Sequence, residues 1–339
     1  MGLRYNNTSS PGVETLSSIT YVNPLNPNYL ADPFVWSHKG IYYATGTGPA
    51  SQSTDGPKYF PLLRSDDMIN WESIGHALLP PSSDLGEHFW APEVAYSDGT
   101  FYFYYSVGRE GRHHLRVAIS KNPEGPYEDN GEPMNDTESC PFAIDGHAFR
   151  DDDGQWYFFY ARDFLDSDDT VRPGTALAVD RLMDMVKLAG EEKTVARARS
   201  DWQRFMANRP MYGGAYDWHT LEGPFVRKHD GKYYCFYSGG CYENDSYGVD
   251  YAVSESVMGP YSDLGNESGA RVLRTAPGHI IGPGHHSITL APDGETEYII
   301  YHAWDPAMTA RRMCMDKLIW TPDGPRCQGP TWTPQELPV

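Results

Sequence analysis

Asp153-Gly154-Gln155-Trp156-Tyr157-Phe158-Phe159-Tyr160 decides the fold of this 339-residue chain, because segments of the same kind occur five times. In each copy a turn precedes an aromatic strand, and Asp-Gly before such a run is a strong β-hairpin signal. The other aromatic strands lie at residues 41–46, 100–106, 232–238 and, more weakly, 297–302. Each copy therefore reads as the second strand of a hairpin.

A first strand precedes each aromatic strand, and a third follows in most copies. The first strands are expected at residues 32–36, 92–96, 145–149, 222–226 and 286–290, and the third strands at 115–120, 251–254 and 312–318. Five such units predict an all-β protein, a single-domain five-bladed β-propeller over residues 1–339, with the blades within 22–320 and a closing tail to 339. A β-sandwich is the alternative. Residues 181–212 are expected to form an irregular or partly helical insertion in the third unit.

Acidic residues stand at or near the start of four predicted first strands. They are Asp32, Glu93, Asp145 and Glu222, while His285 and His286 occupy the corresponding region of the fifth unit. In a propeller the innermost strand of every blade lines the central channel, so these side chains should converge near one mouth. Gathering carboxylates is costly unless protons are shared. Glycoside hydrolysis needs one protonated carboxylic acid and one ionised carboxylate, and this arrangement supplies both.

Composition excludes several partners. The formal net charge of -19 argues against nucleic acid and against an anionic membrane surface, and no apolar stretch is long enough to span a membrane. The first seven residues show no signal peptide, so the chain is predicted to be cytoplasmic, with secretion after removal of a leader as the alternative. The odd count of five cysteines leaves at least one thiol unpaired. Cys235 and Cys241 form either a disulfide or two reduced thiols.

Several short motifs together make the chain resemble glycoside hydrolase family 43, whose members are α-L-arabinofuranosidases, β-xylosidases and arabinanases on a five-bladed propeller. The motifs are Ala31-Asp32-Pro33, Trp90-Ala91-Pro92-Glu93-Val94, Ile144-Asp145, Leu221-Glu222-Gly223-Pro224 and Gly284-His285-His286-Ser287. The resemblance spans about residues 22–320. It implies that Asp32 is the general base, that Glu222 is the general acid and that Asp145 tunes the pKa of Glu222. It also implies inversion at the anomeric carbon, with the acid and base roughly 6.5–9.5 Å apart.

Five further residues are predicted to bind substrate. Trp90 is either a sugar platform or core, Glu93 either contacts substrate or makes a structural hydrogen bond, and His147 either contacts substrate or packs. His286 and Arg312 complete the set. The resemblance places His285 in the channel near a cation such as Ca²⁺, although that ion prefers oxygen ligands and would be held mostly through water. No cofactor is expected for the chemistry.

The leading functional prediction is release of terminal α-L-arabinofuranosyl residues from arabinose-containing glycans. β-Xylosidase activity and endo-1,5-α-L-arabinanase activity on the same site are the nearest alternatives. A non-catalytic sugar-binding propeller is the remote one.

Overall fold

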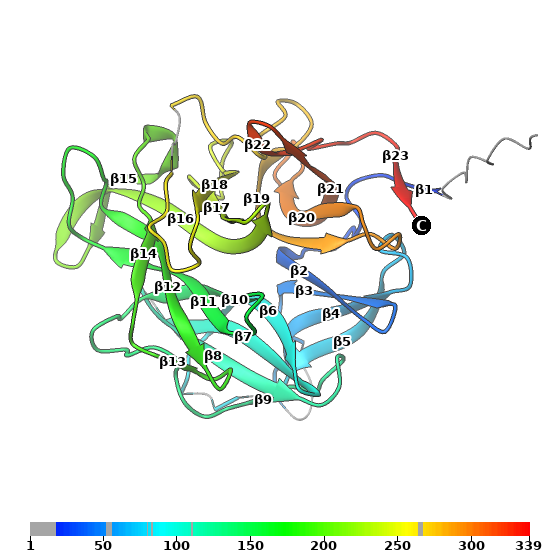
Figure 1. Ribbon diagram of the computed structural model, residues 1–339, viewed down its shortest axis with the longest axis horizontal. Helices are drawn as coiled ribbons and strands as arrows, with labels where there is room; N and C mark the ends of the chain where they lie inside the picture. The colour runs from blue at the N-terminus through cyan, green and yellow to red at the C-terminus, as the bar shows by residue number, and fades with distance from the viewer. Residues whose placement is uncertain (1–17, 52–55, 80, 83, 110, 264–266) are drawn as a thin grey trace, which may run out of the picture.

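The computed structural model describes residues 18–51, 56–79, 81–82, 84–109, 111–263 and 267–339, and almost every regular element in them is a β-strand (Figure 1). The first seven residues, on which the absence of a leader was argued, lie outside these ranges. Within the described part of the chain, no helix is long and apolar enough to cross a membrane. All five cysteines are free thiols, so Cys235 and Cys241 do not form the disulfide that was one of two readings.

The strands form five consecutive antiparallel units. The first unit contains β2 (Ala31–His38), β3 (Ile41–Thr47), β4 (Tyr59–Ser65) and β5 (Glu72–Leu78). The second contains β6 (His88–Ser97), β7 (Thr100–Arg109), β8 (Arg112–Ser120) and β9 (Glu128–Asp129). The third contains β10 (Ala143–Arg150), β11 (Trp156–Phe164) and β12 (Gly174–Met183), with the short β13 (Lys187–Leu188) and β14 (Lys193–Ala196). The fourth unit contains β16 (Gly214–His229), β17 (Lys232–Gly239) and β18 (Gly248–Ser254), and β15 (Arg204–Met211) pairs with β16. The fifth contains β19 (Ile281–Leu290), β20 (Glu297–Trp304), β21 (Arg311–Thr321) and β22 (Gly324–Cys327).

The first strand of every unit faces the centre of the molecule, which confirms the predicted five-bladed β-propeller. The inner strands β2, β6, β10, β16 and β19 contact one another in order, and β19 returns to β2 to close the ring. The third and fourth blades are further joined by a short parallel pairing of Gly174 with His219 and Thr175 with Thr220. Strands β1 (Ser18–Tyr21) and β23 (Gln335–Pro338) pair separately and bring the start and end of the described chain together (Figure 1).

Turn chemistry explains why the hairpins form where the sequence predicts them. Asp98-Gly99 and Asp230-Gly231 both have positive φ at both residues, 49° and 76° in the first and 47° and 74° in the second. This is the type I′ turn, whose twist matches that of the flanking strands. Lys39-Gly40 has the same geometry, with φ of 53° and 79°. Three of the five blades therefore join their first two strands through the same two-residue turn.

Aromatic side chains fill the spaces between blades. Phe60 of the first blade packs against two rings of the second blade, with ring centroids 5.3 Å from Phe103 and 6.2 Å from Phe89. These rings are buried, and such pairs add to the free energy gained from burying their area. Most of the aromatic residues therefore serve the core, and few are available to the channel mouth.

The prediction for residues 181–212 was wrong in its main feature. The segment contains strands β13, β14 and β15, and its only helical turn among the described residues is the 3-10 helix η1 (Asp201–Gln203). Strand β15 pairs with the first half of β16, and this extends the fourth blade as a long hairpin. Its sequence, Arg204–Met211, lacks the apolar alternation of the other strands because none of its eight residues is buried in the core, so the strand gave no signal.

Candidate active site

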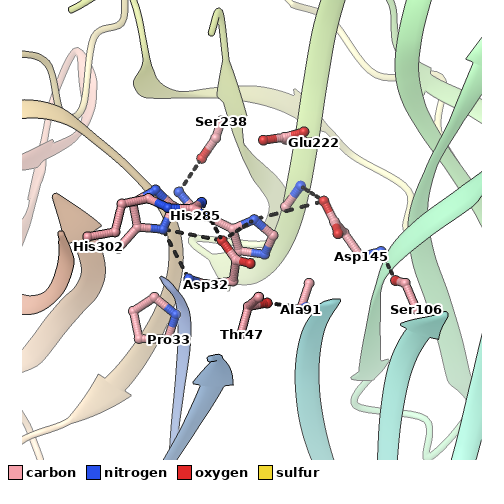
Figure 2. Close-up of polar contacts among 12 residues, drawn as sticks. Asp32, Pro33, Thr47, Ala91, Ser106, Asp145, Glu222, Ser238, His285 and His302 are labelled. Atoms are coloured by element: carbon pink, nitrogen blue, oxygen red, sulfur yellow. Dashed lines mark hydrogen bonds and ion pairs between the residues drawn. The ribbon is translucent and has the colours of Figure 1, made fainter. Parts of the chain in front are cut away.

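A cavity of about 260 Å³ opens at the mouth of the central channel, and the three predicted catalytic carboxylates line it. Asp32 comes from β2, Asp145 from β10 and Glu222 from β16, so three inner strands place them around one space (Figure 2). The cavity lies at or just below the lower end of the roughly 300–1,000 Å³ usual for small-molecule sites. Its other lining residues are Thr47, Trp90, Gly111, Phe142, Ile144, Thr175, Phe205, Arg209, Thr220, Tyr242, His285 and Arg311.

Asp32 is surrounded by groups that favour its charged form. Its Oδ1 lies 3.4 Å from Nδ1 of His285, 3.3 Å from Nδ1 of His302 and 3.6 Å from Nη1 of Arg311. Burial raises the pKa of this carboxyl, but the charges of His285 and Arg311 outweigh burial and hold the pKa well below its usual value. Nδ1 of His302 accepts the backbone N–H of Asp32, so the neutral ring donates no hydrogen bond to the carboxylate from that atom. Burial also lowers the pKa of both imidazoles, so at neutral pH Arg311 is the permanent cation beside Asp32. Asp32 is therefore ionised.

Glu222 has the opposite electrostatics. Burial raises the pKa of its carboxyl to about 7, and the negative charge of Asp32 adds to the rise, although a hydrogen bond opposes it. That hydrogen bond comes from the Tyr247 hydroxyl, which donates to Oε1 of Glu222 across 2.6 Å. Near neutral pH a large fraction of Glu222 therefore carries a proton in a cavity that also contains an ionised carboxylate.

Asp145 is close enough to the other two carboxylates for the charge of each to act on it. Its Oδ2 accepts a hydrogen bond from the backbone N–H of Gly223 at 3.0 Å and lies 3.9 Å from Nδ1 of His285. Burial and the charges of Glu222 and Asp32 raise its pKa well above the usual value. Whichever of Asp145 and Glu222 ionises first makes the second ionisation harder, so the two carboxyls titrate as a pair.

Glu93 and His147 do not line the cavity. Both side chains are nearly buried, and Nδ1 of His147 lies 2.7 Å from Oε2 of Glu93. Nε2 of His147 accepts the backbone N–H of Val226 at 3.1 Å, so the proton of the neutral ring is on Nδ1 and is donated to Glu93. The hydrogen bond between them gives each buried side chain a polar partner. This placement favours the structural reading that was open for both.

His286 and Arg312 also lie away from the cavity. The ring of His286 is buried, and within the described part of the chain neither of its nitrogens has a hydrogen-bond partner. Arg312 forms an ion pair with Asp305, and its Nε donates to the Pro27 carbonyl at 2.8 Å. Successive residues of a strand point to opposite faces, and Arg311, its neighbour in β21, takes the place at the cavity that was predicted for Arg312.

Trp90 does line the cavity, and one of its ring faces is already occupied. It stacks on the ring of His113 with centroids 3.8 Å apart and planes inclined by 16°. Burial holds the pKa of His113 at about 3, so the imidazole under Trp90 is neutral. The half-buried Trp90 is thus supported from one side, and an aromatic ring fixed in this way can serve as a sugar platform.

Several residues at the cavity gave no clear signal in the sequence. Tyr247, which donates to Glu222, lies between β17 and β18. Phe205 and Arg209, which line the cavity, belong to the β15 hairpin, so none of the three stands at the start of an inner strand. The Arg209 guanidinium lies over the rings of Phe205 and Trp218, at 4.9 and 5.5 Å from their centroids. Only the long hairpin brings these side chains over the channel, and its path depends on tertiary pairing.

The described residues contain no group of side chains that could ligate the calcium ion expected near His285. Nowhere in them do three or more His, Cys, Asp or Glu side chains gather in a way that could hold a metal ion. His285 itself offers a nitrogen, which is a poor donor for Ca²⁺, and its Nδ1 faces Asp32 and Asp145. The side chains therefore do not fit a directly ligated calcium ion, and no chemical step is derived through one.

One ionised carboxylate and a pair of carboxyls that can retain a proton, facing one small cavity, are the groups that glycoside hydrolysis requires. The comparison with known families makes this specific. The model of the family described as "Glycosyl hydrolases family 43" matches residues 21–325, and the chain belongs to that family.

Relatives with different activities match most of the chain. It is 28% identical over 329 residues to a β-D-galactofuranosidase of Aspergillus niger, covering 91% of this chain and 85% of the relative. It is 26% identical over 294 residues to an extracellular endo-α-(1→5)-L-arabinanase of Bacillus subtilis, covering 81% and 80%. Among solved structures, a thermostable family-43 glycoside hydrolase matches with a TM-score of 0.79 and 31% identity, covering 94% of this chain and 99% of that one.

These relatives correct the predicted localisation. The Bacillus subtilis arabinanase is extracellular, and so are matching exo-acting arabinofuranosidases of Streptomyces avermitilis and Cellvibrio japonicus. The prediction that this chain is cytoplasmic conflicts with that finding and was wrong. It rested on the amino acids at the start of the chain, which cannot carry such a conclusion.

Proposed function

We propose that this glycoside hydrolase releases terminal α-L-arabinofuranosyl residues from arabinose-containing oligo- or polysaccharides, with inversion at the anomeric carbon. The observation that carries the proposal is the pairing of an ionised Asp32 with a protonated Glu222 on different walls of a cavity of about 260 Å³. A space of that size suits one sugar ring, and this favours exo over endo action. The extracellular relatives support a secreted enzyme.

The proposed reaction divides the work between the carboxyls. Asp32 accepts a proton from a water molecule as the water oxygen attacks the anomeric carbon. The bond from that carbon to the leaving oxygen breaks, and Glu222 gives its proton to the leaving oxygen. Asp145 raises the pKa of Glu222 when it is ionised, and its contact with the Gly223 N–H holds the neighbouring backbone. Trp90 supports the sugar ring, and Arg311 keeps Asp32 charged.

A β-D-galactofuranosidase activity is the second candidate, and the Aspergillus niger relative favours it. β-D-Galactofuranosides and α-L-arabinofuranosides share a five-membered ring of the same configuration and differ by one exocyclic hydroxymethyl group. A site that accepts one could accept the other if its wall leaves room for that group. β-Xylosidase and endo-arabinanase activities remain the alternatives within the family.

The test is hydrolysis of matched 4-nitrophenyl glycosides by the wild-type protein and by Glu222→Gln. The substrates are α-L-arabinofuranoside, β-D-galactofuranoside and β-D-xylopyranoside, with linear arabinan as a polymeric substrate. Preferred turnover of the arabinofuranoside that is lost in the variant supports the proposal. Preferred turnover of another glycoside, or of arabinan from within the chain, replaces it with that activity. The anomer released first, followed by NMR, decides inversion.

We further propose that no cofactor takes part in the chemistry and that any calcium ion in the channel is held through water and affects stability only. Treatment with a chelator should then leave kcat unchanged, whatever it does to Tm. A loss of kcat that added Ca²⁺ restores would contradict this.

A further inference from the structure

All five inner strands carry the same irregularity where they reach the cavity. In each, the register with the second strand shifts, and the residue directly after the last one paired before this shift has a left-handed φ. These residues are Asp32 (50°), Ala91 (46°), Asp145 (60°), Gly223 (56°) and His285 (44°). Residues other than glycine rarely adopt this conformation, and it persists only where the surroundings hold it.

A side chain from the preceding blade holds each of four such residues through its backbone N–H. Ala91 donates to Oγ1 of Thr47 at 2.8 Å, and Asp145 donates to Oγ of Ser106 at 2.9 Å. His285 donates to Oγ of Ser238 at 2.7 Å. Asp32 donates to Nδ1 of His302 at 3.0 Å, which links the fifth blade to the first (Figure 2). We call this ring of contacts the interblade belt.

The four acceptors occupy one equivalent position. Each is the cross-strand partner of the residue just before the left-handed one in its own blade, so Thr47 faces Ala31, Ser106 faces Trp90, Ser238 faces Glu222 and His302 faces Gly284. They belong to the second strands β3, β7, β17 and β20, and Figure 2 shows them around the carboxylates. A position filled by a hydrogen-bond acceptor in four blades is a constraint on the backbone of the next blade.

The third blade is the exception, and it is the blade that carries Asp145. The equivalent residue there is Ala161, which faces Ile144 and has no side-chain acceptor. The N–H of Gly223 in the fourth blade instead donates to Oδ2 of Asp145 at 3.0 Å. A carboxylate that lines the cavity thus takes the place of a belt residue, between the blade that carries Asp145 and the blade that carries Glu222.

We propose that Thr47, Ser106, Ser238 and His302 are positioning residues, whose contacts in the interblade belt fix the backbone from which the carboxylates project. Ser106, Ser238 and His302 are fully buried, so water cannot readily replace a lost acceptor. Ser106 lies outside the cavity lining and acts only through Asp145. The proposal rests on the roles given above to the three carboxylates.

Ser106→Ala tests the belt where it reaches the proton-sharing pair. Removing the acceptor frees the backbone of Asp145, and a displacement of about 1 Å at an active site can cost on the order of 100-fold in rate. We expect kcat to fall by about 10- to 100-fold with little change in KM, because no substrate contact is lost. The basic limb of the pH profile should move to lower pH, because a relaxed Asp145 repels the Glu222 anion less. Ser106→Thr keeps the hydroxyl and should restore both.

Thr45→Val is the matched control. Thr45 lies two residues before Thr47 in β3 and is fully buried, and within the described residues its hydroxyl has no hydrogen-bond partner. This change alters a buried hydroxyl without touching the belt, and kcat and the pH profile should stay at the wild-type values. An equal loss in Thr45→Val and Ser106→Ala would show a general packing effect and overturn the proposal.

Wild-type kcat and pH profile in a folded Ser106→Ala protein would also overturn it. If that variant does not fold, Ser238→Ala decides, because its loss should lower kcat through His285, which contacts Asp32 and Asp145. The pH dependence of Tm is measured in parallel and reports the titration of Asp145 and Glu222 without substrate. An inactive wild-type protein would refute the proposed function, whereas a shifted Tm profile in Ser106→Ala would still support the belt.

Discussion

Asp32 and Glu93 each contact an imidazole of another inner strand, and the two contacts differ in what surrounds them. The side chains of Asp32 and Glu93 are 11% and 13% exposed, so burial does not separate them. Asp32 lines the cavity and has Arg311 at 3.6 Å, whereas Glu93 lies outside the cavity lining and accepts a hydrogen bond from Nδ1 of His147. The pKa of Asp32 is lowered, and burial raises that of Glu93 well above its usual value. Access and a permanent cation, and not residue type, make a carboxylate available for chemistry.

Replacing a carboxyl by a neutral amide should have the largest effect on kcat, and it tests the difference between carboxyls inside and outside the cavity. Glu222→Gln removes the proposed general acid, and we expect kcat to fall by about 10²–10⁴-fold. Glu93→Gln replaces a buried carboxyl whose pKa is raised, and the amide oxygen can still accept the Nδ1 proton of His147. Turnover of the Glu93 variant should therefore remain close to that of the wild type. Comparable losses in both variants would show that Glu93 belongs to the reacting groups.

The raised pKa of Glu222 also predicts how stability depends on pH. Burial raises this pKa from 4.5 to about 7, so between these values the folded protein retains a proton that the unfolded chain has released. The contribution is complete below pH 4.5 and is lost as pH rises through about 7, and it amounts to about 3 kcal/mol in the free energy of unfolding. Chemical denaturation across this range measures it. Glu222→Gln should flatten the dependence, and an unchanged slope would contradict the assignment.

The contact between Glu93 and His147 should show its importance in stability instead. His147→Ala leaves the Glu93 carboxyl and the Val226 N–H without their partner, and each unsatisfied buried group costs about 1–3 kcal/mol. We expect a lower free energy of unfolding, while the folded variant keeps far more activity than Glu222→Gln. Denaturant titration and steady-state kinetics on the same preparation separate the two effects. A loss of kcat at full stability would assign His147 to the site.

The sequence predicts the parts of this molecule that depend on local geometry. Type I′ turns, aromatic strands and carboxylates at strand starts are visible because each needs particular residues at particular spacings. Glu93 was placed with the site because it also stands near a strand start, but it follows the bulge at Ala91, and its side chain contacts His147 and does not line the cavity. The register of a bulge and the path of the β15 hairpin depend on partners distant in sequence.

The smallest predicted effect is a shift in a pH profile, and Arg311 and Arg312 allow a well-controlled test of it. They are adjacent in β21 and contact different partners. Arg311→Gln removes the cation beside Asp32, so the pKa of Asp32 should rise and the acidic limb of the pH profile should move up by about 1 unit. Arg312→Gln breaks contacts with Asp305, Thr309 and Pro27, none of which touches Asp32, and should leave that limb in place. Profiles of kcat/KM from acidic to neutral pH compare the pair. Equal shifts would mean that general surface charge, and not the contact with Arg311, keeps Asp32 ionised.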